Sequence, residues 1–337
     1  MQNTKWKLKN IGVANNSLPI DNDILSILAG RSIFKKQDII RFINPSLDNL
    51  QDPKKLYDMQ KAVDRLKKAI KDGEKICIYG DYDVDGITST SILYLALKKL
   101  NHNNIFYYIP LRDEGYGLNK KAIDEIKNSD TDLIITVDCG INSFEEVEYI
   151  KKLNMKVIIT DHHNLQGKKV PEALAVINPK RIENEYTFES LAGVGTVFML
   201  VLSLFESYGK KEEAFEYLDL VSIWTIADIV PLLSENRILT RFGLEKLPFT
   251  KNRGLAFLLY KLFNSGENKG NNPKSEYSTY DVGFIIAPVF NAAGRLKDAK
   301  MVVKLLTSDN NREIEIIVKE LINKNFERKE LQNRIGE

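Results

Sequence analysis

Residues 75–86 read Lys-Ile-Cys-Ile-Tyr-Gly-Asp-Tyr-Asp-Val-Asp-Gly, an apolar stretch followed directly by three aspartates on alternate positions. The apolar part predicts a buried strand, and residues 87–100 predict a helix that apolar side chains nearly surround. Asp81, Asp83 and Asp85 therefore follow the end of a strand. Three like charges this close together raise one another's pKa unless a cation offsets them, so the stretch predicts a divalent-metal site.

A calcium loop is the simplest alternative for this stretch. The three aspartates and Gly86 occupy the first, third, fifth and sixth places of an EF-hand signature. The twelfth place, which should hold a bidentate Glu, is Ile92. The segment before the loop also predicts a strand, whereas an EF-hand loop follows a helix. The pattern therefore disfavours a calcium loop.

The composition is that of a globular protein. The chain has 337 residues, of which 43% are hydrophobic and 28% charged, enough for one large domain or two smaller ones. It lacks both an apolar run of roughly 18 residues, as a membrane span needs, and a signal-peptide core at the N-terminus, so we expect a cytoplasmic protein. Two cysteines do not make a disulfide framework, and Cys77 is predicted to be a buried thiol. Because the net charge is only +2, contact with nucleic acid requires a local patch.

Short β-rich runs and helical patterns alternate after residue 75. Further strands are predicted at residues 105–109, 132–137 and 156–160, and residues 143–153 between the last two have helical spacing. This βαβ rhythm predicts an α/β fold with a parallel sheet and helices on both faces.

The second half of the chain is predicted to be mostly helical. Long helical patterns run through residues 194–208, 212–226 and 241–263. Residues 266–278 predict an exposed loop, and residues 311–334 predict a charged helix.

Acidic residues follow three of the predicted strands. Asp81 follows the first, Asp138 follows residues 133–137, and Asp161 follows residues 157–160. A single Asp after a strand is usually a turn former or a helix N-cap. Ligands, however, bind outside the carboxyl ends of parallel strands. Aspartates after three strands, with three of them after the first, therefore predict one shared acidic edge of the sheet.

Two of the three histidines, His162 and His163, follow Asp161 directly. A neutral imidazole is a common metal ligand, and carboxylates with one imidazole suit manganese or magnesium. Adjacent residues point in different directions, so one ring can bind metal while the other faces substrate. His102 lies in a polar turn and is predicted to be a solvated loop residue.

Asp228 ends an apolar helical pattern within the sequence Thr-Ile-Ala-Asp-Ile-Val-Pro-Leu at residues 225–232. An unpaired carboxylate would be costly to bury there. It therefore requires a metal or a cationic partner such as Arg237, and this segment alone does not choose between them.

Taken together, these motifs resemble the DHH phosphoesterase superfamily. They are Gly-Asp-Tyr-Asp-Val-Asp-Gly (80–86), Val-Asp-Cys-Gly (137–140), Asp-His-His (161–163) and Ala-Asp-Ile-Val-Pro-Leu (227–232). Further support comes from Gly-Tyr-Gly-Leu (115–118), Ile-Asn-Pro-Lys (177–180), Leu-Ala-Gly-Val-Gly (191–195) and Ile-Ala-Pro-Val-Phe-Asn-Ala-Ala-Gly-Arg-Leu (286–296). The resemblance covers roughly residues 45–337. Branches that act on small substrates typically begin with a His near the first aspartate, whereas here Asp81 leads, which favours the single-stranded-DNA exonuclease branch.

The resemblance implies a fold, an activity and its cofactors. The expected reaction is two-metal hydrolysis of phosphodiester bonds in single-stranded DNA, from the 5′ to the 3′ end, in DNA repair and recombination, with two Mn²⁺ or Mg²⁺ ions. A single-stranded-DNA-binding protein or a helicase is an expected partner. The expected parts are an N-terminal extension (1–50), the catalytic α/β domain (51–235), a mostly helical extension that completes it (236–310) and a connecting helix (311–337).

The resemblance also implies roles for individual residues. The metal ligands would be Asp81, Asp83, Asp85, Asp138, His162 and Asp228, with Asp138 bridging the two ions. His163 would face the scissile phosphate, and Asp161 would orient an imidazole. Asn291 and Arg295 would grip phosphate oxygens, and Arg112 is a weaker candidate for that role.

Two departures from the family pattern bear on substrate binding. Relatives often carry Arg where this chain has Val289, which removes one cationic contact. Relatives also continue through a long helix into a second domain with a glycine-rich motif that binds nucleic acid, and this sequence stops within that helix. We therefore expect a sequence cut from a longer protein, and weak DNA binding by the catalytic half alone.

Two other functions stay open. One is a phosphodiesterase for small nucleotides or oligoribonucleotides, and the other is a scaffold of the same fold that binds nucleic acid without cleaving it. A scaffold would be expected to lose metal ligands, whereas every expected ligand is present here.

Overall fold

The computed structural model describes residues 18–111, 114–167, 169–264, 274–295 and 299–336. The chain divides into two compact units, Met1–Leu50 and Gln51–Glu337. The first contains the helices α1 (Asn22–Gly30) and α2 (Lys36–Ile43). Asp21 caps α1, because its side chain accepts a hydrogen bond from the N–H of Asp23 at 2.7 Å.

The second unit is built on a five-stranded sheet in the described part of the chain, with strand order β2-β1-β3-β4-β5 and all neighbours parallel. The strands are β1 (Ile76–Gly80), β2 (Ile105–Tyr108), β3 (Leu133–Val137), β4 (Lys156–Thr160) and β5 (Ala175–Ile177). The predicted α/β fold with a parallel sheet is confirmed, and the first four strands lie within one residue of their predicted ends. The fifth has only three residues, too few to show a period in the sequence.

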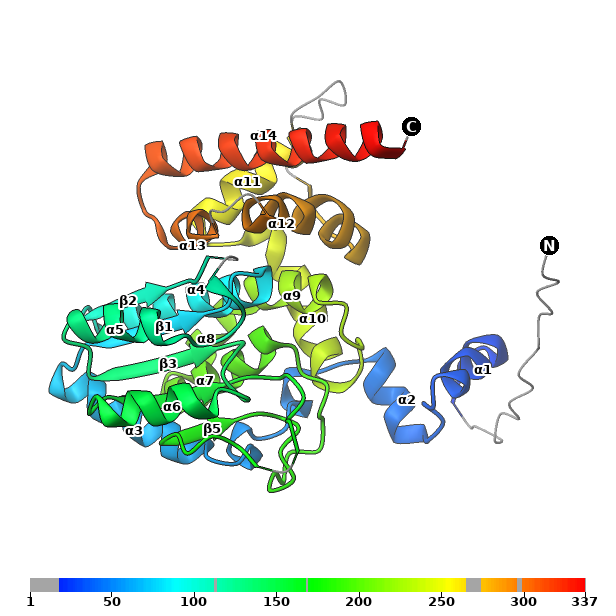
Figure 1. Cartoon of the computed structure of the whole chain (residues 1–337). Helices are drawn as coiled ribbons and strands as arrows, with labels where there is room; N and C mark the ends of the chain where they lie inside the picture. The colour runs from blue at the N-terminus through cyan, green and yellow to red at the C-terminus, as the bar shows by residue number, and fades with distance from the viewer. Residues whose placement is uncertain (1–17, 112–113, 168, 265–273, 296–298, 337) are drawn as a thin grey trace. The chain divides into compact units, whose positions relative to one another are not determined.

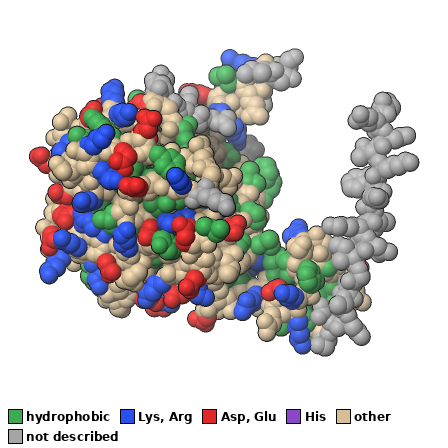
Figure 2. Space-filling model, turned by 60° about the horizontal axis from the view of Figure 1, so that its bottom comes forward, with side chains coloured by type: hydrophobic (Ala, Val, Ile, Leu, Met, Phe, Trp, Pro, Cys, Tyr) green, Lys and Arg blue, Asp and Glu red, His purple; other side chains and the backbone are tan. Residues whose placement is uncertain are grey.

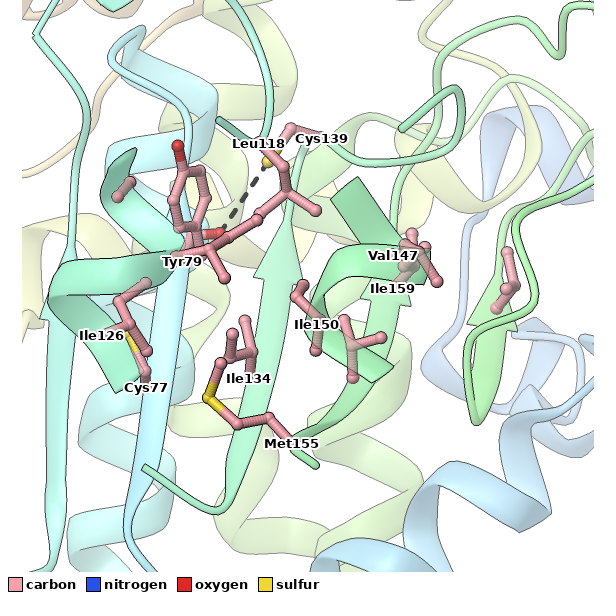
Figure 3. Packing of buried hydrophobic residues seen from close by; sticks show 14 of the residues in the cluster. Cys77, Tyr79, Leu118, Ile126, Ile134, Cys139, Val147, Ile150, Met155 and Ile159 are labelled. Atoms are coloured by element: carbon pink, nitrogen blue, oxygen red, sulfur yellow. Dashed lines mark hydrogen bonds between the residues drawn. The ribbon is translucent and has the colours of Figure 1, made fainter. Parts of the chain in front are cut away.

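Helices cover both faces of the sheet, as Figure 1 shows. The helices α5 (Lys120–Asn128) and α6 (Phe144–Lys152) cover one face, where Tyr79, Ile134 and Ile159 pack against Ile126 and Ile150 in a fully buried cluster (Figure 3). The helices α3 (Met59–Asp72), α4 (Val84–Lys99) and α7 (Gly193–Ser207) pack on the other face. Strands buried on both faces are apolar without alternation, which explains the continuous apolar runs in the sequence.

The strand order creates a switch point between β1 and β3. From β1 the chain crosses through α4 to β2 on one side, and it then returns through α5 to β3 on the other side of β1. The connections at the carboxyl ends of β1 and β3 therefore diverge to opposite faces of the sheet. Open α/β sheets bind their ligands in the crevice at such a point.

The second half of the unit is helical and is interrupted more often than the sequence indicates. Its elements are α8 (Lys211–Ala214), η4 (Phe215–Tyr217), α9 (Leu218–Ala227), α10 (Ser234–Lys246), η5 (Leu247–Phe249), α11 (Arg253–Asn264), η6 (Asp281–Ile286), α12 (Ala287–Arg295), α13 (Lys300–Thr307) and α14 (Asn311–Gly336). Residues 241–263, predicted to be mostly helical, are divided at the 3₁₀ turn η5, because Pro248 has no N–H to continue α10. Most of the predicted loop 266–278 lies outside the described residues.

His102 is not solvated, so that prediction is wrong. Its exposed fraction is only 3%, because the turn folds back on α4 and the His102 N–H donates to the Leu97 carbonyl at 3.0 Å. Burial lowers the pKa of its imidazole. Cys77 is a buried free thiol as predicted, and Cys139 is also free and buried, with its Sγ 3.9 Å from the Tyr79 carbonyl oxygen (Figure 3).

The surface carries charges of both signs. On the face that Figure 2 shows, Lys and Arg side chains are interspersed with Asp and Glu, in keeping with the small net charge. Within the ranges that the structure describes, each helix is too short or too polar to cross a membrane.

Gly243 allows α10 to pack directly on α9, the helix that ends at Asp228. A Cβ at this position would overlap the Leu218 carbonyl oxygen and the Ser222 side chain. We expect Gly243→Ala to lower the free energy of unfolding by about 1–3 kcal/mol through overpacking, measured by urea denaturation. The control is Gly283→Ala, whose Cβ meets nothing within 4 Å and which should keep or raise stability. Equal losses in both variants would contradict this packing.

Candidate metal centre at the carboxyl edge of the sheet

The strand register brings three aspartates to one edge of the sheet. Gly80 pairs with Val137, and Val137 pairs with Thr160, so the next residue of each strand lies at the same level. These next residues are Asp81, Asp138 and Asp161, and all three are buried. Asp81 and Asp138 flank the switch point.

Two helix N-termini fix the other aspartates of the first motif. Asp83 is the N-cap of α4, and its Oδ1 accepts from the N–H groups of Asp85 and Gly86 at 2.9 and 3.0 Å. The buried carboxylate of Asp85 accepts from the first two N–H groups of α7, those of Gly193 and Val194, at 2.8 Å each. The positive end of α7 thus holds a negative side chain that comes from α4.

Gly193 is the residue that permits this approach. A Cβ there would overlap Asp138 Oδ1 and would lie 2.8 Å from Asp85 Oδ2. Any side chain at this position would therefore displace one of the two buried carboxylates.

Asp138 has an unusual backbone conformation. Its φ is +62°, in the left-handed region that Asp tolerates better than most residues. The Thr136 hydroxyl holds the turn by donating to the Cys139 carbonyl at 2.8 Å. Left-handed residues cluster at functional sites, where the surrounding structure holds them in place.

His162 presents one defined ring nitrogen to the carboxylates. Its Nδ1 lies 3.1 Å from the Leu191 carbonyl, which can only accept, so Nδ1 carries the proton. Nε2 then faces Asp138 Oδ1 at 3.2 Å and Asp85 Oδ2 at 3.9 Å. Burial and the neighbouring His163 lower the pKa of His162 to about 4. The ring is therefore neutral near pH 7 and has a free lone pair, as a metal ligand requires.

His163 is held by Asp161 and Tyr116. Asp161 Oδ1 lies 2.7 Å from His163 Nδ1 and also accepts the N–H groups of both histidines, while Oδ2 accepts the N–H of Ile141 at 2.9 Å. The Tyr116 hydroxyl lies 3.0 Å from His163 Nδ1. Although burial opposes it, the hydrogen bond from His163 lowers the pKa of Asp161, and the same bond raises the pKa of His163. Asp161 is thus occupied in orienting the His163 ring.

A cleft of about 90 Å³ opens beside these groups. Its lining includes Asp83, Asp85, Asp228, Trp224 and Asn291, so the helices α9 and α12 each bring a polar side chain to the cluster. Partial burial and the charge of Asp83 raise the pKa of Asp228 to about 6.

The sequence alone does not decide whether Asp228 binds a metal or pairs with a cation such as Arg237. The cationic groups that lower the pKa of Asp228 are His163 and Lys180. The residue after it, Ile229, has a φ of +59° and is 88% exposed, so the chain is strained where it leaves the cluster.

The donor atoms of the cluster suit divalent metal ions. Three groups of side chains have donor atoms within 4.8 Å of one another: Asp81, Asp83 and Asp138; Asp85, His162 and Asp228; and Asp138, His162 and His163. Asp81 Oδ1 and Asp138 Oδ1 are buried without a hydrogen-bond partner. Buried polar atoms normally have partners, so these two oxygens indicate a missing ligand.

The titration of the carboxylates agrees with this donor set. Burial and Asp83 raise the pKa of Asp81 to about 7. Burial and neighbouring aspartates raise the pKa of Asp85 and of Asp138 well above the usual range. Carboxylates that repel one another need a cation, and oxygen donors with one neutral imidazole suit Mn²⁺ or Mg²⁺.

The structure brings together all six residues expected as metal ligands, together with Asp161, His163 and Asn291. Arg112 lies outside the described residues, and of Arg295 only the backbone, at the end of α12, is described. Val289 is fully buried, so this position of α12 belongs to the core.

Sequence reasoning assigned no role to three groups at the site. They are the N–H groups of Gly193 and Val194, the hydroxyl of Tyr116, and Lys180, whose N–H is tied to the His163 carbonyl through Asn178. All three lie in motifs quoted for the family resemblance, but a motif does not tell which of its atoms face the cluster.

Comparisons with known proteins identify relatives of the chain. Residues 75–223 match the DHH family, N-terminal domain. The single-stranded-DNA-specific exonuclease RecJ of Bacillus subtilis is 40% identical over 313 residues, which are 93% of this chain and 38% of that protein. The RecJ of Escherichia coli is 37% identical over 319 residues, 91% of this chain and 53% of that protein. The chain thus spans about half or less of the length of these curated relatives.

Solved structures give the same result. A crystal structure of exonuclease RecJ bound to manganese superposes with a TM-score of 0.75 at 34% identity, covering 86% of this chain and 70% of that one. RecJ from Thermus thermophilus in complex with Mn²⁺ has a TM-score of 0.75 at 31% identity, covering 91% of this chain and 42% of that one. The predicted superfamily is confirmed, and the chain belongs to the RecJ family of DHH proteins.

Proposed function

We propose that the chain is a metal-dependent phosphodiesterase that removes mononucleotides from the 5′ end of single-stranded DNA, as in repair and recombination. The observation that carries the proposal is the cluster of carboxylates and one neutral imidazole at the switch point, in which two buried oxygens have no partner. Relatives named single-stranded-DNA-specific exonuclease support the substrate.

Two Mn²⁺ or Mg²⁺ ions would be held by Asp81, Asp83, Asp85, Asp138, His162 and Asp228, as structures of RecJ in complex with Mn²⁺ and Mg²⁺ suggest for the family. Asp138 and His162 each belong to two of the three donor groups. A carboxylate has two oxygens to offer, whereas His162 has only Nε2 left because its Nδ1 faces the Leu191 carbonyl, so Asp138 would be the residue shared by the two ions. When bound, such ions neutralise charge on the phosphate and acidify water, so that hydroxide is available near neutral pH.

The chain's own residues would bind and orient the strand. Asp161 accepts a hydrogen bond from Nδ1–H of His163, and Nε2, which lies 3.3 Å from the Tyr116 hydroxyl, would meet a phosphate oxygen. Asn291 lines the cleft beside Asp228, where its amide can donate to a second oxygen. Trp224 and Val84 add apolar side chains to the lining of the cleft.

The same proposal includes a location in the cell and protein partners. Both cysteines are free, a state that the reducing cytoplasm maintains, and we place the protein there. A single-stranded-DNA-binding protein or a helicase would present the strand, because the substrate is the form of DNA that such proteins hold or produce.

The substrate is tested with the purified chain in Mn²⁺. A 5′-phosphorylated single strand should shorten from its 5′ end and release mononucleotides, while a blunt duplex of the same sequence stays intact, as followed on denaturing gels. A dinucleotide is assayed in parallel. Faster cleavage of the dinucleotide than of the strand would instead support the small-nucleotide phosphodiesterase. Strands that the chain binds but leaves intact in both Mn²⁺ and Mg²⁺ would support the scaffold.

Asp138→Asn tests the role of the cluster. Because it removes one charge from the residue shared by two donor groups, we expect kcat to fall at least about 100-fold and the rise in Tm on adding Mn²⁺ to disappear. The matched control is Asp64→Asn, an exposed residue of α3 that should keep both properties. Unchanged activity in Asp138→Asn would refute the proposed centre.

The pH dependence of metal stabilisation follows from the raised pKa values of Asp81, about 7, and Asp228, about 6. Without metal, these groups stabilise the folded state when protonated at low pH, and that stability is lost as the pH rises through about 6 and 7. Mn²⁺ offsets the repulsion of the ionised groups. The rise in Tm caused by Mn²⁺ should therefore be larger at about pH 8 than at about pH 5.5 in thermal melts, and an equal rise at both pH values would contradict this.

A further inference from the structure

Lys180 stands at the same edge of the sheet as the metal cluster. It follows β5 by three residues, and β5 pairs with β4, the strand that ends just before Asp161. Lys180 and His163 are linked through one buried side chain, because Asn178 Nδ2 donates to the His163 carbonyl at 3.0 Å and Asn178 Oδ1 accepts the Lys180 N–H at 2.8 Å. The backbone of Lys180 is therefore tied to the backbone of the histidine pair.

The next residue, Arg181, anchors this turn to the fold. Its guanidinium is buried, pairs with Asp58 and Glu183 at 3.0 Å each, donates to the Val176 carbonyl at 2.7 Å and lies over the Tyr57 ring at 4.5 Å. Arg181 is thus fully engaged within the fold. It fixes the position from which the Lys180 side chain extends.

Lys180 differs from its neighbour in having no counter-ion. Its side chain is partly buried, and in the ranges that the structure describes no carboxylate lies within ion-pair distance of its Nζ. A lysine that is tied to the His163 backbone and has no ion pair among the described residues has its ammonium available to bind an anion.

We propose that Lys180 forms a phosphate subsite for the nucleic-acid strand, on the β5 side of the metal cluster and opposite Asn291 of α12. This subsite rests on the proposed function, because its ligand is a phosphate of the strand that the cluster cleaves. A lysine suits the role as a flexible point charge with three donors. The strand would lie between the Asn178–Lys180 turn and α12, with its reacting phosphate over the carboxylates.

The test compares Lys180→Met with Lys156→Met. Lys156 is exposed at the start of β4, at the opposite edge of the sheet, and serves as the matched control. For a 5′-phosphorylated dT20 in Mn²⁺, Lys180→Met should raise KM about three- to tenfold with little change in kcat. It should also reduce the slope of log KM against log salt by about 0.7, the effect of one lost phosphate contact on a single strand. Lys180→Arg, which keeps the charge, should have a KM close to that of wild type.

A second readout does not depend on turnover. In EDTA, the fluorescence anisotropy of labelled dT20 should report a similar loss of affinity for Lys180→Met and none for Lys156→Met. The rise in Tm on adding Mn²⁺ should match wild type in both variants, because Lys180 is not a metal ligand. A strand with a 5′-hydroxyl identifies the phosphate: an effect confined to the 5′-phosphorylated strand places the terminal phosphate at Lys180, and an equal effect places an internal phosphodiester there.

The outcomes separate this proposal from the one on which it rests. If wild type and Lys156→Met cleave the strand and Lys180→Met has the same KM and salt slope, the subsite is wrong and the proposed function stands. If Lys180→Met loses the Mn²⁺-induced rise in Tm, Lys180 acts on the fold or the metal centre, and the subsite is also wrong. If wild type neither binds nor cleaves the strand, the proposed function fails and the subsite fails with it.

Discussion

Mutual repulsion among buried carboxylates is the constraint on which the rest of this structure depends. Asp81, Asp85 and Asp138 lie at one sheet edge, with pKa values raised by burial first and by neighbouring aspartates second. A fold that buries such a set needs compensating positive charge. Part of it comes from the N-terminus of α7, whose first two N–H groups donate to Asp85. Asp81 Oδ1 and Asp138 Oδ1 are buried without a hydrogen-bond partner, and a bound cation would supply the rest.

The architecture around the cluster meets this constraint. The strand order opens a crevice between β1 and β3, and the register sets Asp81 and Asp138 side by side at its mouth. Gly193 lets α7 approach closely enough to donate, and the carbonyl of Leu191 just before it fixes the tautomer of His162. Residues 191–194, where the chain enters α7, thus position two expected metal ligands, His162 and Asp85. Asp161 then holds the second imidazole, that of His163, beside the same cluster, with its Nδ1 4.0 Å from Asp138 Oδ1.

Much of this could be predicted from the sequence. The continuous apolar runs of β1, β3 and β4 predict a parallel sheet, because strands buried on both faces need no alternation. An Asp after each of these strands predicts a common acidic edge. The strand order could not be predicted, since periodicity carries no information on which strands are neighbours. The sequence also does not show that Asp83 is both an N-cap and a candidate ligand, because both roles favour the same residue type.

The local sequence pattern led to a wrong prediction where tertiary packing determines which residues are buried. His102 lies in a polar turn, yet it is buried because the turn folds back on α4. The importance of Lys180 is likewise invisible in the sequence, where it stands beside Arg181 as a second basic residue. The ion pairs of Arg181 show that this cation belongs to the fold, whereas Lys180 has no ion pair among the described residues.

The central claim is that this cluster is a centre for two divalent ions. Equilibrium dialysis against Mn²⁺ at about pH 8, where the carboxylates are ionised, with free ion measured by electron paramagnetic resonance, counts the ions bound to the chain. We expect two per chain. Binding of no ion, or of a single ion, would contradict the account.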